Sequence, residues 1–407
     1  MKPYVDALVR EALSDAIEAG LLRTRTIPGF RVDAPRYPAF GDLACDVALV
    51  LARELGEPPL AIAALVTGRL RDRHGWLAAV DVGGPGFVNF RFAPSFWRAR
   101  LADAVAAGTG YGQVVSGRGR RVRIEMEPGD RSAAPSVEDG RGAAVAGAAA
   151  RLLAAAGSDV EQIGGVPDLD PPATAAVATG TPDEIVAVVG AAQAACVVRR
   201  AAARSEAALR VLTVHPVRLT RDGEPVRSAL TLREVVDEVG GDATRFLLLL
   251  ERPERPVDLD LELAKLERTD NPLFYVQYAC ARLARVAGAT VPGAGESDLS
   301  HLDAELDDSD VEPLRMLAAW PDVVDQATRA VEPHRIAAHA VELAAVAHRW
   351  MNRNRMVTKE PEPTRARLAL ARCLRQMLNE ALRLCGVSAP ERIARPDVEE
   401  VERWRTR

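Results

Sequence analysis

The sequence predicts an α/β protein joined to an all-α part, and three observations support this prediction. Strand-like segments are confined to two stretches, residues 76–93 and 121–219. From residue 228 onward the apolar residues recur at helical spacing almost to the end of the chain. The 48% hydrophobic content is weighted to Ala, with only 4% aromatic residues, and Ala favours helices. With 407 residues, the chain is long enough for two to three domains.

Residues 1–110 predict a small N-terminal α+β domain. Residues 1–20 have an amphipathic helix pattern, and helical periodicity resumes over 40–56 and 60–72. WLAAVDVGGPGFVNFRFA (76–93) alternates apolar residues around GGPG, which is typical of two strands joined by a tight turn. The glycine-rich residues 108–121 then predict a linker.

Residues 118–227 predict an α/β unit with a very small sheet. RVRIEM (121–126), DEIVAVVG (183–190) and LRVLTVHPVRL (209–219) predict about three strands, and their alternation with helices favours a parallel sheet. Between the first strand and its helix, the loop carries Gly140 and Gly142, in the position where nucleotide-binding folds hold phosphates. The same loop carries Glu138 and Asp139, whose carboxylates would repel a phosphate.

The rest of the chain predicts a helical connector (228–270), a helical bundle (271–393) and a C-terminal extension (394–407). Its charge is uneven, because residues 291–332 hold eleven acidic and two basic residues, whereas 333–407 hold fifteen basic and nine acidic ones. The net charge of −5 argues against a protein that coats nucleic acid indiscriminately. The basic region is either a solvated helix face or a surface that meets phosphates.

Cysteine usage and hydropathy exclude several other classes. The five cysteines form no CxxC pair, so neither a disulfide framework nor a metal site is expected. No apolar run reaches the roughly 18 to 20 residues of a membrane span, and the N-terminal helix is acidic, unlike a signal peptide. We therefore expect a reduced cytoplasmic protein without a membrane partner.

DNPLFYVQYACARLARV (270–286) is the most informative segment, because it resembles the NP-(V/L)-(F/Y)-YVQYAHAR signature of arginyl-tRNA synthetases. Similarity to this family extends over nearly the whole chain, through residues 40–56, 85–97, 231–250, 256–272, 332–357 and 365–393. The resemblance implies three parts: the small N-terminal α+β module, a reduced Rossmann-like class I synthetase core and a C-terminal helical anticodon-binding bundle.

The resemblance implies tRNA binding at both ends of the chain. On the helix predicted for 270–286, phenol, amide and guanidinium groups fall at helical spacing, so they could stack on unpaired bases and bond their edges. These groups belong to Tyr275, Gln277, Tyr278 and Arg282. A second, cationic and aromatic cluster consists of Arg349, Trp350, Arg353 and Arg355. The alternative is that some of these aromatic residues fill the bundle core.

At the N-terminal end, Phe87 and Asn89 match the family's Gly-Phe-(Ile/Val)-Asn turn, which is implicated in gripping the D-loop of tRNA. An aromatic face beside an amide can read a base. The alternative is a core Phe and a turn Asn.

The family's first ATP signature is altered. In the closest register, the pattern HVGHGRGAAV aligns with SVEDGRGAAV (136–145). Ser136 and Asp139 stand where the family has two histidines, and Glu138 replaces the intervening glycine. Carboxylates at this turn invert the electrostatics that adenylation needs.

Other parts of the implied active site are changed too. PGDRSA (128–133) does not match the family's Ser-Ala-Asn-Pro-Thr-Gly run, and VGAAQAACVV (189–198) lacks its Asp-His-His. RDGEPVR (221–227) runs directly into SALTLRE, without a Lys-Met-Ser-Lys loop. Only about 20 residues (163–183) stand where the family has a long insertion. We therefore expect no catalytic residues and no cofactor.

Three functions follow. The first is a protein that lacks arginine activation and binds tRNA or a tRNA-like partner. The second is a residual or repurposed ATP-dependent ligase, with Glu138, Asp139 and His215 as candidate groups and ATP as its cofactor. The third is a scaffold that binds a protein partner through the bundle and the acidic segment 296–312.

Overall fold

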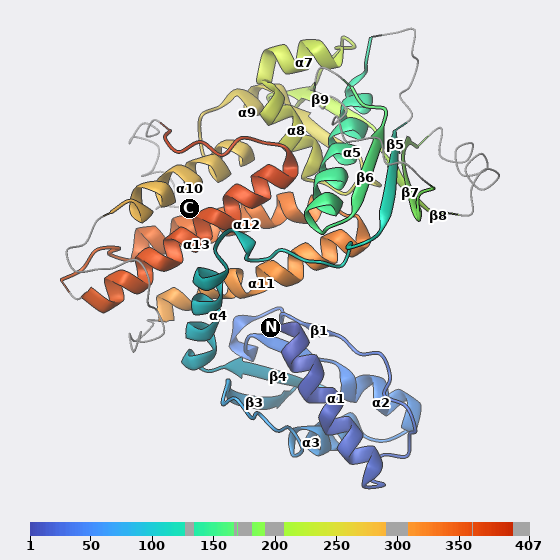
Figure 1. Cartoon of the computed structure of the whole chain (residues 1–407), viewed down its shortest axis with the longest axis vertical. Coiled ribbons are helices and arrows are strands. Elements are labelled where there is room, and N and C mark those ends of the chain that lie inside the picture. The colour runs from blue at the N-terminus through green and yellow to red at the C-terminus, as the bar shows by residue number, and fades with distance from the viewer. Residues whose placement is uncertain are drawn as a thin grey trace. The chain divides into compact units, whose positions relative to one another are not determined.

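The computed structural model describes residues 1–126, 134–166, 169, 181–191, 207–289, 308–359 and 361–393. Figure 1 shows the chain, which divides into two compact units. The first unit comprises Met1–Ala107 and Gly295–Asp322, and the second comprises Gly108–Ala294 and Val323–Arg407. Several predicted features lie outside the described residues, namely 128–133, 192–198, 394–407 and most of 296–312.

The first unit contains an antiparallel sheet in the order β1-β2-β4-β3. Its strands are β1 (Val32–Asp33), β2 (Leu43–Cys45), β3 (Leu77–Gly83) and β4 (Phe87–Phe92), and β3 and β4 form the hairpin predicted over 76–93. Its helices include α1 (Lys2–Glu18), α2 (Val47–Leu55), α3 (Pro59–Thr67) and α4 (Pro94–Ala107). Val88, Phe90 and Phe92 alternate along β4 and are buried, so one face of the sheet forms the core of this unit.

Residues 308–322 lie in the first unit, whereas the sequence predicts that they belong to the bundle segment 271–393. Two ion pairs inside this unit give the physical reason. Arg315 lies 2.5 Å from the buried carboxylate of Asp42, and the Met1 ammonium lies 3.6 Å from Asp322. Contacts between residues so distant in sequence leave no periodic signal from which they could be predicted.

The second unit contains a parallel sheet in the order β6-β5-β7-β8. Its strands are β5 (Arg121–Met126), β6 (Asp159–Ile163), β7 (Glu184–Gly190) and β8 (Ala208–Val214). Strand β6 was not predicted, because this edge strand reads Asp-Val-Glu-Gln-Ile and lacks the apolar run of a buried strand. The strand predicted over 209–219 breaks after Val214, and its second half enters another sheet.

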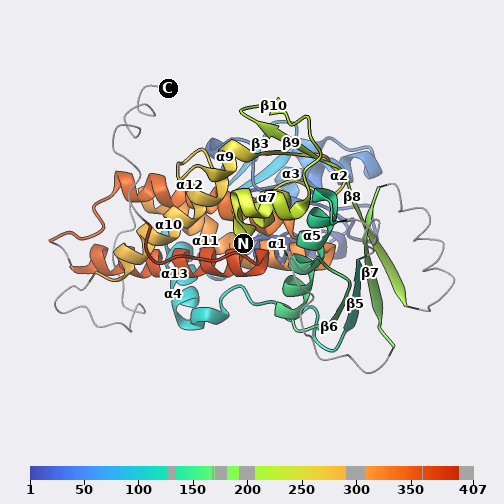
Figure 2. The ribbon, with the colours of Figure 1, turned by 90° about the horizontal axis from the view of Figure 1, so that it is seen from above.

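Helix α5 (Val137–Ala155) packs on strands β5, β6 and β7, and on helices α8 and α13 on its other side (Figures 1 and 2). Its residues are mostly Ala and Gly, and nearly all are buried. A Cβ added at Gly142 would lie 3.3 Å from Met126 Cε, and one at Gly140 would lie 2.4 Å from Leu232 Cδ1. The small residues therefore allow the helix to approach its neighbours on all sides closely.

A second sheet follows in the order β10-β9-β11. It comprises β9 (Val217–Arg221), β10 (Glu224–Pro225) and β11 (Val257–Asp260). Strands β9 and β10 form a hairpin with Asp222 and Gly223 at φ 49° and 81°, the signs that a type I′ turn requires. Three short helices surround it: α7 (Leu232–Val239), α8 (Gly241–Leu249) and α9 (Leu261–Lys265).

The C-terminal helices α10 (Pro272–Ala287), α12 (His334–Arg353) and α13 (Pro361–Cys385) pack against one another, as Figure 2 shows. Helix α11 (Asp308–Ala330) precedes α12. The predicted helical bundle is confirmed, and its core is rich in Leu and Ala. None of the described helices is both long and apolar enough to cross a lipid bilayer.

Candidate functional site

Strand order places the start of α5 at the switch point of the parallel sheet. The chain passes from β5 through α5 to β6 on one side, and then crosses to β7 on the other side of β5. In open α/β sheets, ligands bind outside the carboxyl ends of the strands where the direction reverses in this way. The predicted residues Ser136, Glu138 and Asp139 lie at this end of the sheet, in the first turn of α5 and at its cap.

The N-terminus of α5 is capped by its own side chains. Ser136 Oγ accepts a hydrogen bond from the Asp139 backbone N–H, at 3.1 Å. In return, Asp139 Oδ2 accepts bonds from the Ser136 N–H at 2.9 Å and from the Ser136 hydroxyl at 2.8 Å. This capping box puts a carboxylate at the positive end of the helix dipole, where a nucleotide-binding fold would hold a phosphate.

The two charged residues beside this cap, Glu138 and Arg141, also contact other parts of the protein. Glu138 is exposed, and its Oε1 lies 3.4 Å from the Val217 N–H at the start of β9. The Arg141 side chain is completely buried and donates to three backbone carbonyls, those of His215, Arg252 and Arg255, at 2.6–2.8 Å. Arg141 therefore fixes two loops to α5 and cannot extend toward a ligand.

Among the residues that the structure describes, no group of three or more His, Cys, Asp or Glu side chains could hold a metal ion. His215, a candidate group of the ligase alternative, follows β8 and is half-buried. Its backbone is fixed at both ends: its N–H donates to Pro253 O, and its carbonyl accepts from Arg141.

Residues 221–234, where the family resemblance implies a Lys-Met-Ser-Lys loop, form a short, fixed connection. After the β9–β10 hairpin, the chain reaches α7 within a few residues, and the Leu232 N–H donates to Pro135 O at 2.9 Å. The Leu232 side chain lies against Gly140, so α7 begins directly on the first turn of α5. Thr231 and Glu234 form a second capping box there.

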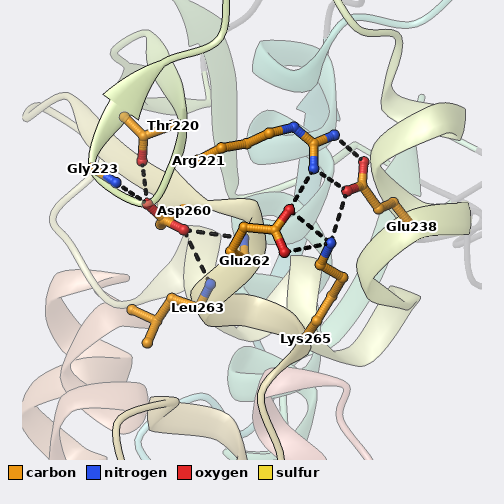
Figure 3. A network of polar contacts seen from close by, with 8 residues as sticks. All are labelled: Thr220, Arg221, Gly223, Glu238, Asp260, Glu262, Leu263 and Lys265. Atoms are coloured by element: carbon orange, nitrogen blue, oxygen red, sulfur yellow. Dashed lines mark hydrogen bonds and ion pairs between the residues drawn. The ribbon is translucent and has the colours of Figure 1, made fainter.

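A network of ion pairs holds this connection (Figure 3). Arg221 on β9 binds Glu238 on α7 through both terminal nitrogens and also binds Glu262 on α9, at 2.7 Å. Lys265 contacts the same two carboxylates at 3.2 and 2.8 Å. The Arg221 guanidinium lowers the pKa of Glu238, and the Lys265 ammonium lowers that of Glu262. The two cations and two anions tie three elements together.

Asp260 is the second centre of the network in Figure 3. Its carboxylate caps α9 by accepting from the N–H groups of Glu262 and Leu263, and it also accepts from the Gly223 N–H and the Thr220 hydroxyl. Desolvation alone would raise the pKa of Asp260, but these hydrogen bonds lower it to about 2. The hairpin is thereby fixed to α9.

In the bundle, the Asn-Pro pair that begins α10 has a local structural role. Asn271 is the N-cap, and its Oδ1 accepts from the N–H groups of Leu273 and Phe274. Its Nδ2 donates to the carbonyls of Ala264 and Leu266, and Pro272 occupies the first helical position, where no N–H is needed. The pair therefore sets the start and direction of α10.

A polar aromatic face is shared by α10 and α12, and we call it the α10–α12 face. It consists of Tyr275, Tyr278, Arg282, His348 and Asn352. Arg282 Nη1 lies 2.9 Å from His348 Nδ1, and Nη2 donates to Asn352 Oδ1 at 2.8 Å. The His348 ring lies 4.6 Å from that of Tyr275 and 5.4 Å from that of Tyr278.

The structure therefore brings three of the predicted residues together and adds two that sequence analysis missed. His348 and Asn352 are four residues apart on α12, a spacing that would have indicated one helix face. Burial, together with the nearby Arg282 charge, lowers the pKa of His348 to about 4, so its imidazole is neutral at physiological pH. Phe274 is buried in the bundle core.

Two of the side chains that were predicted to contact RNA, those of Trp350 and Gln277, make contacts within the protein instead. Trp350 is only 2% exposed and belongs to the bundle core, because its position on α12 faces the other helices. Gln277 Nε2 donates to Ser388 O at 3.0 Å, so this amide fixes the segment that follows α13. By contrast, the predicted cations Arg349, Arg353 and Arg355 are exposed.

In the first unit, Phe87 and Asn89 lie two residues apart on β4 and therefore on one face of the sheet. Phe87 is 38% exposed, so its ring is available to a ligand. Asn89 lies within the strand, paired with Ala44 and Asp81, and is only 7% exposed. The predicted turn Asn is thus a strand residue, because the tight turn ends before Phe87.

Comparison with known families gives matches at both ends of the chain. The model described as "Arginyl tRNA synthetase N terminal domain" matches residues 5–92. The model described as "DALR anticodon binding domain" matches residues 276–393. These matches cover the unit that carries Phe87 and the helices that carry the α10–α12 face.

The chain is also similar to whole proteins. It is 28% identical to the arginine–tRNA ligase of Anaeromyxobacter dehalogenans (strain 2CP-C), over 98% of this chain and 99% of the relative. The ligase of Syntrophotalea carbinolica is 26% identical, over 97% and 100%. The arginyl-tRNA synthetase structure from Thermus thermophilus has the same fold, with a TM-score of 0.74 at 16% identity, over 97% of this chain and 100% of that chain.

The alignment also locates a difference in length. It extends over 597 positions with the first of these ligases, whereas this chain has 407 residues. At least 190 aligned positions therefore have no residue in this chain, although both ends of the relative are matched. The missing length falls inside the protein rather than at its ends.

Proposed function

Because this chain belongs to the arginyl-tRNA synthetase family, we propose that it binds tRNA through its terminal domains and has lost arginine activation. The observation that carries the second half is the capping box at the switch point. There the Asp139 carboxylate holds the helix end that would otherwise bind a phosphate. The retained GRGAAV segment preserves the turn and the helix, but not the donors.

Simple electrostatics indicate how strongly the Asp139 carboxylate would oppose phosphate binding at this helix end. Two unit negative charges about 4 Å apart repel each other by about 4 kcal/mol at an effective dielectric constant of 20. The loss of one hydrogen-bond donor to the transferring group typically lowers the rate of the chemical step by a factor of about 10² to 10³. Asp139 adds such a charge and stands where the family has a donor histidine, so adenylation would suffer from both changes.

The fixed connection after β9 supports the same proposal. The family's second signature lies on a loop between these elements, whereas here α7 begins on the first turn of α5. The Arg221 network ties β9 directly to α7 and α9, and only a few residues connect β10 to α7. The absence of at least 190 aligned positions within the chain agrees with such a loss.

ATP–pyrophosphate exchange tests the loss of activation. The purified chain is assayed with arginine and with the other standard amino acids, each with and without tRNA, beside an active arginine–tRNA ligase. We expect exchange from the ligase and none from this chain above the background without protein. Robust exchange with any amino acid would contradict the proposal.

The binding half is tested separately. The anticodon-binding match and the exposed cations of the bundle support salt-sensitive binding of tRNA. Fluorescence anisotropy with labelled tRNA at low salt measures it directly. If no tRNA binds at low salt, this half of the proposal is wrong.

Residual or repurposed ligase activity is the second candidate, and the names of the relatives favour it, since they are called arginine–tRNA ligases. Glu138, Asp139 and His215 would be its acid–base groups. Two of these side chains are involved in other contacts, because Asp139 caps α5 and Glu138 lies beside the Val217 N–H. The exchange assay distinguishes the two candidates.

A further inference from the structure

We propose that the first unit carries a second base-stacking surface for unpaired RNA nucleotides, formed by Tyr37 and Phe40 with the guanidinium groups of Arg36 and Arg91. We call it the Tyr37–Phe40 surface. The inference rests on the proposed tRNA binding and extends it to residues outside the Phe87 motif.

The backbone presents both rings to solvent from a fixed turn. Pro38–Phe40 forms a single 3₁₀ turn, in which the Phe40 N–H donates to Tyr37 O at 3.0 Å. Gly41 follows with φ 108°, and a Cβ there would lie 2.6 Å from Phe90 O. Asp42 then fixes the chain to β4, because its carboxylate accepts from the Phe92 N–H at 2.7 Å.

The rings of Tyr37 and Phe40 do not pack in the hydrophobic core of the first unit. Tyr37 is 55% exposed and Phe40 is 51% exposed, whereas Phe90 and Phe96 in the same unit are completely buried. The two rings lie edge to face, with their centroids 6.2 Å apart, so they do not stack face to face on each other. Large apolar side chains grouped on a surface typically mark a binding site.

Two cations accompany the rings. Arg36 Cζ lies 5.5 Å from the Tyr37 ring centroid, and Arg91 Nη2 donates to Ala39 O at 3.1 Å. Within the part of the chain that the structure describes, neither guanidinium forms an ion pair with a carboxylate. Their charge is therefore available to a ligand.

The carboxylates of the neighbouring strand and loop are mostly neutralised. Asp33 pairs with the Lys2 ammonium at 2.6 Å, and Asp46 pairs with Arg31 at 3.1 Å. Asp81 is exposed opposite Asn89, and it can accept hydrogen bonds from the amino groups of bases. The surface thus offers ring faces, unpaired cations and one acceptor.

This combination favours unpaired RNA over a protein partner. Exposed aromatic rings stack on bases of any sequence, and guanidinium groups beside them neutralise the phosphates that connect those bases. A surface that binds an apolar patch of a protein partner would require the rings, but it would not require two arginines that lack ion pairs.

The surface is also continuous with the Phe87 motif. Phe87, Asn89 and Arg91 lie on the same face of β4, and Arg91 reaches the 3₁₀ turn through Ala39. From Phe87 to Arg91 the strand extends about 13 Å, at about 3.3 Å per residue. An RNA loop could therefore place one base on Phe87 and another on the Tyr37–Phe40 surface.

The test uses the full chain and an in vitro transcribed arginine tRNA, with binding measured by fluorescence anisotropy. We expect the double variant Tyr37→Ala, Phe40→Ala to bind this tRNA at least tenfold more weakly, because each stack of a base on an aromatic ring contributes substantially to the binding free energy. The matched control is Leu21→Ala, Leu60→Ala, which removes two apolar side chains that are 47% and 56% exposed in the same unit. Arg36→Gln should lower the slope of log K against log salt by about 1.

A positional measurement accompanies the affinities. Transcripts that contain 4-thiouridine are crosslinked to the wild-type chain, and we expect adducts on the tryptic peptide 37–53. If wild type binds and the double variant binds equally well without such adducts, the surface is not an RNA site, and tRNA binding itself stands. If wild type binds no tRNA, both proposals fail. Loss of a co-purifying protein in the double variant, with RNA binding intact, would also overturn the inference.

Discussion

At the residue scale, the α5 N-terminus shows how two short polar side chains can cap a helix end. Ser136 and Asp139 stand where the family pattern has two histidines, and together they cap the start of α5. The reason is that serine and aspartate satisfy the first N–H groups of a helix without any ligand. The N-terminus of α5 is thus capped by the protein's own side chains.

This cap predicts a measurable stability. Ser136→Ala removes the acceptor for the Asp139 N–H, and we expect a loss of about 1 kcal/mol in the free energy of unfolding. Urea unfolding followed by circular dichroism measures it. Ser136→Thr, which retains a hydroxyl acceptor at the cap, serves as the control and should stay within about 0.5 kcal/mol of wild type. Equal effects of the two variants would contradict the capping role.

Single residues also show the limits of prediction from the sequence. Tyr275, Tyr278 and Arg282 could be grouped because helical spacing alone brings them together. Trp350 and Gln277 have the same residue types as RNA-binding side chains, but the packing of α12 and the segment after α13 direct them elsewhere. Composition of a cluster does not say which way each side chain faces.

At the element scale, helix α12 couples the α10–α12 face to the bundle core. His339 and His348 are buried on this helix, and burial lowers the pKa of each to about 4. Both are therefore neutral in the folded protein at physiological pH. An unfolded chain would protonate them near pH 6.5, so the two states bind different numbers of protons at acidic pH.

The sign of the resulting pH dependence follows directly. Because the folded pKa values are lowered, this stability is complete above pH 6.5 and is lost as the pH falls toward 4. Between pH 7.5 and 4.5, His339 should account for about 2 to 3 kcal/mol of lost unfolding free energy. We expect His339→Leu to lose less stability than wild type over this range, as measured by urea midpoints. An identical loss in both proteins would show that His339 is not responsible.

Elements were predicted best where their pattern is local. The β3–β4 hairpin, α5 and α10 have clear periodicity and end signals, and the structure contains all three. Strand β6 was not predicted, because its sequence is polar and its strand conformation is stabilised by pairing with β5. The Arg221 network joins residues up to about 40 positions apart, so its partners could not be identified from the sequence.

At the scale of the whole molecule, charge decides how tRNA would be held. The net charge is −5, so binding must rely on local basic surfaces rather than on the protein as a whole. The exposed arginines near the end of α12 form one such surface.

We expect Arg353→Ala, Arg355→Ala to weaken tRNA binding and to reduce the slope of log K against log salt by about 2, since each lost phosphate contact removes about 1. Anisotropy titrations at several salt concentrations measure the slope. The control Arg118→Ala, Arg227→Ala removes the same charge from exposed positions outside the bundle. A control slope that falls as much would mean that only total charge matters.

The sequence by itself indicated the resemblance to arginyl-tRNA synthetases, the two terminal domains and the departures from the family's ATP signatures, because these depend on residue identity in a local order. The tertiary structure decided the rest. It showed that Asp139 caps its own helix, that α7 begins on the first turn of α5, and that Tyr37 and Phe40 face solvent beside Arg36 and Arg91, which form no ion pair with any described carboxylate. The physical reason is that burial, ion pairing and side-chain direction depend on segments that meet only when the chain folds.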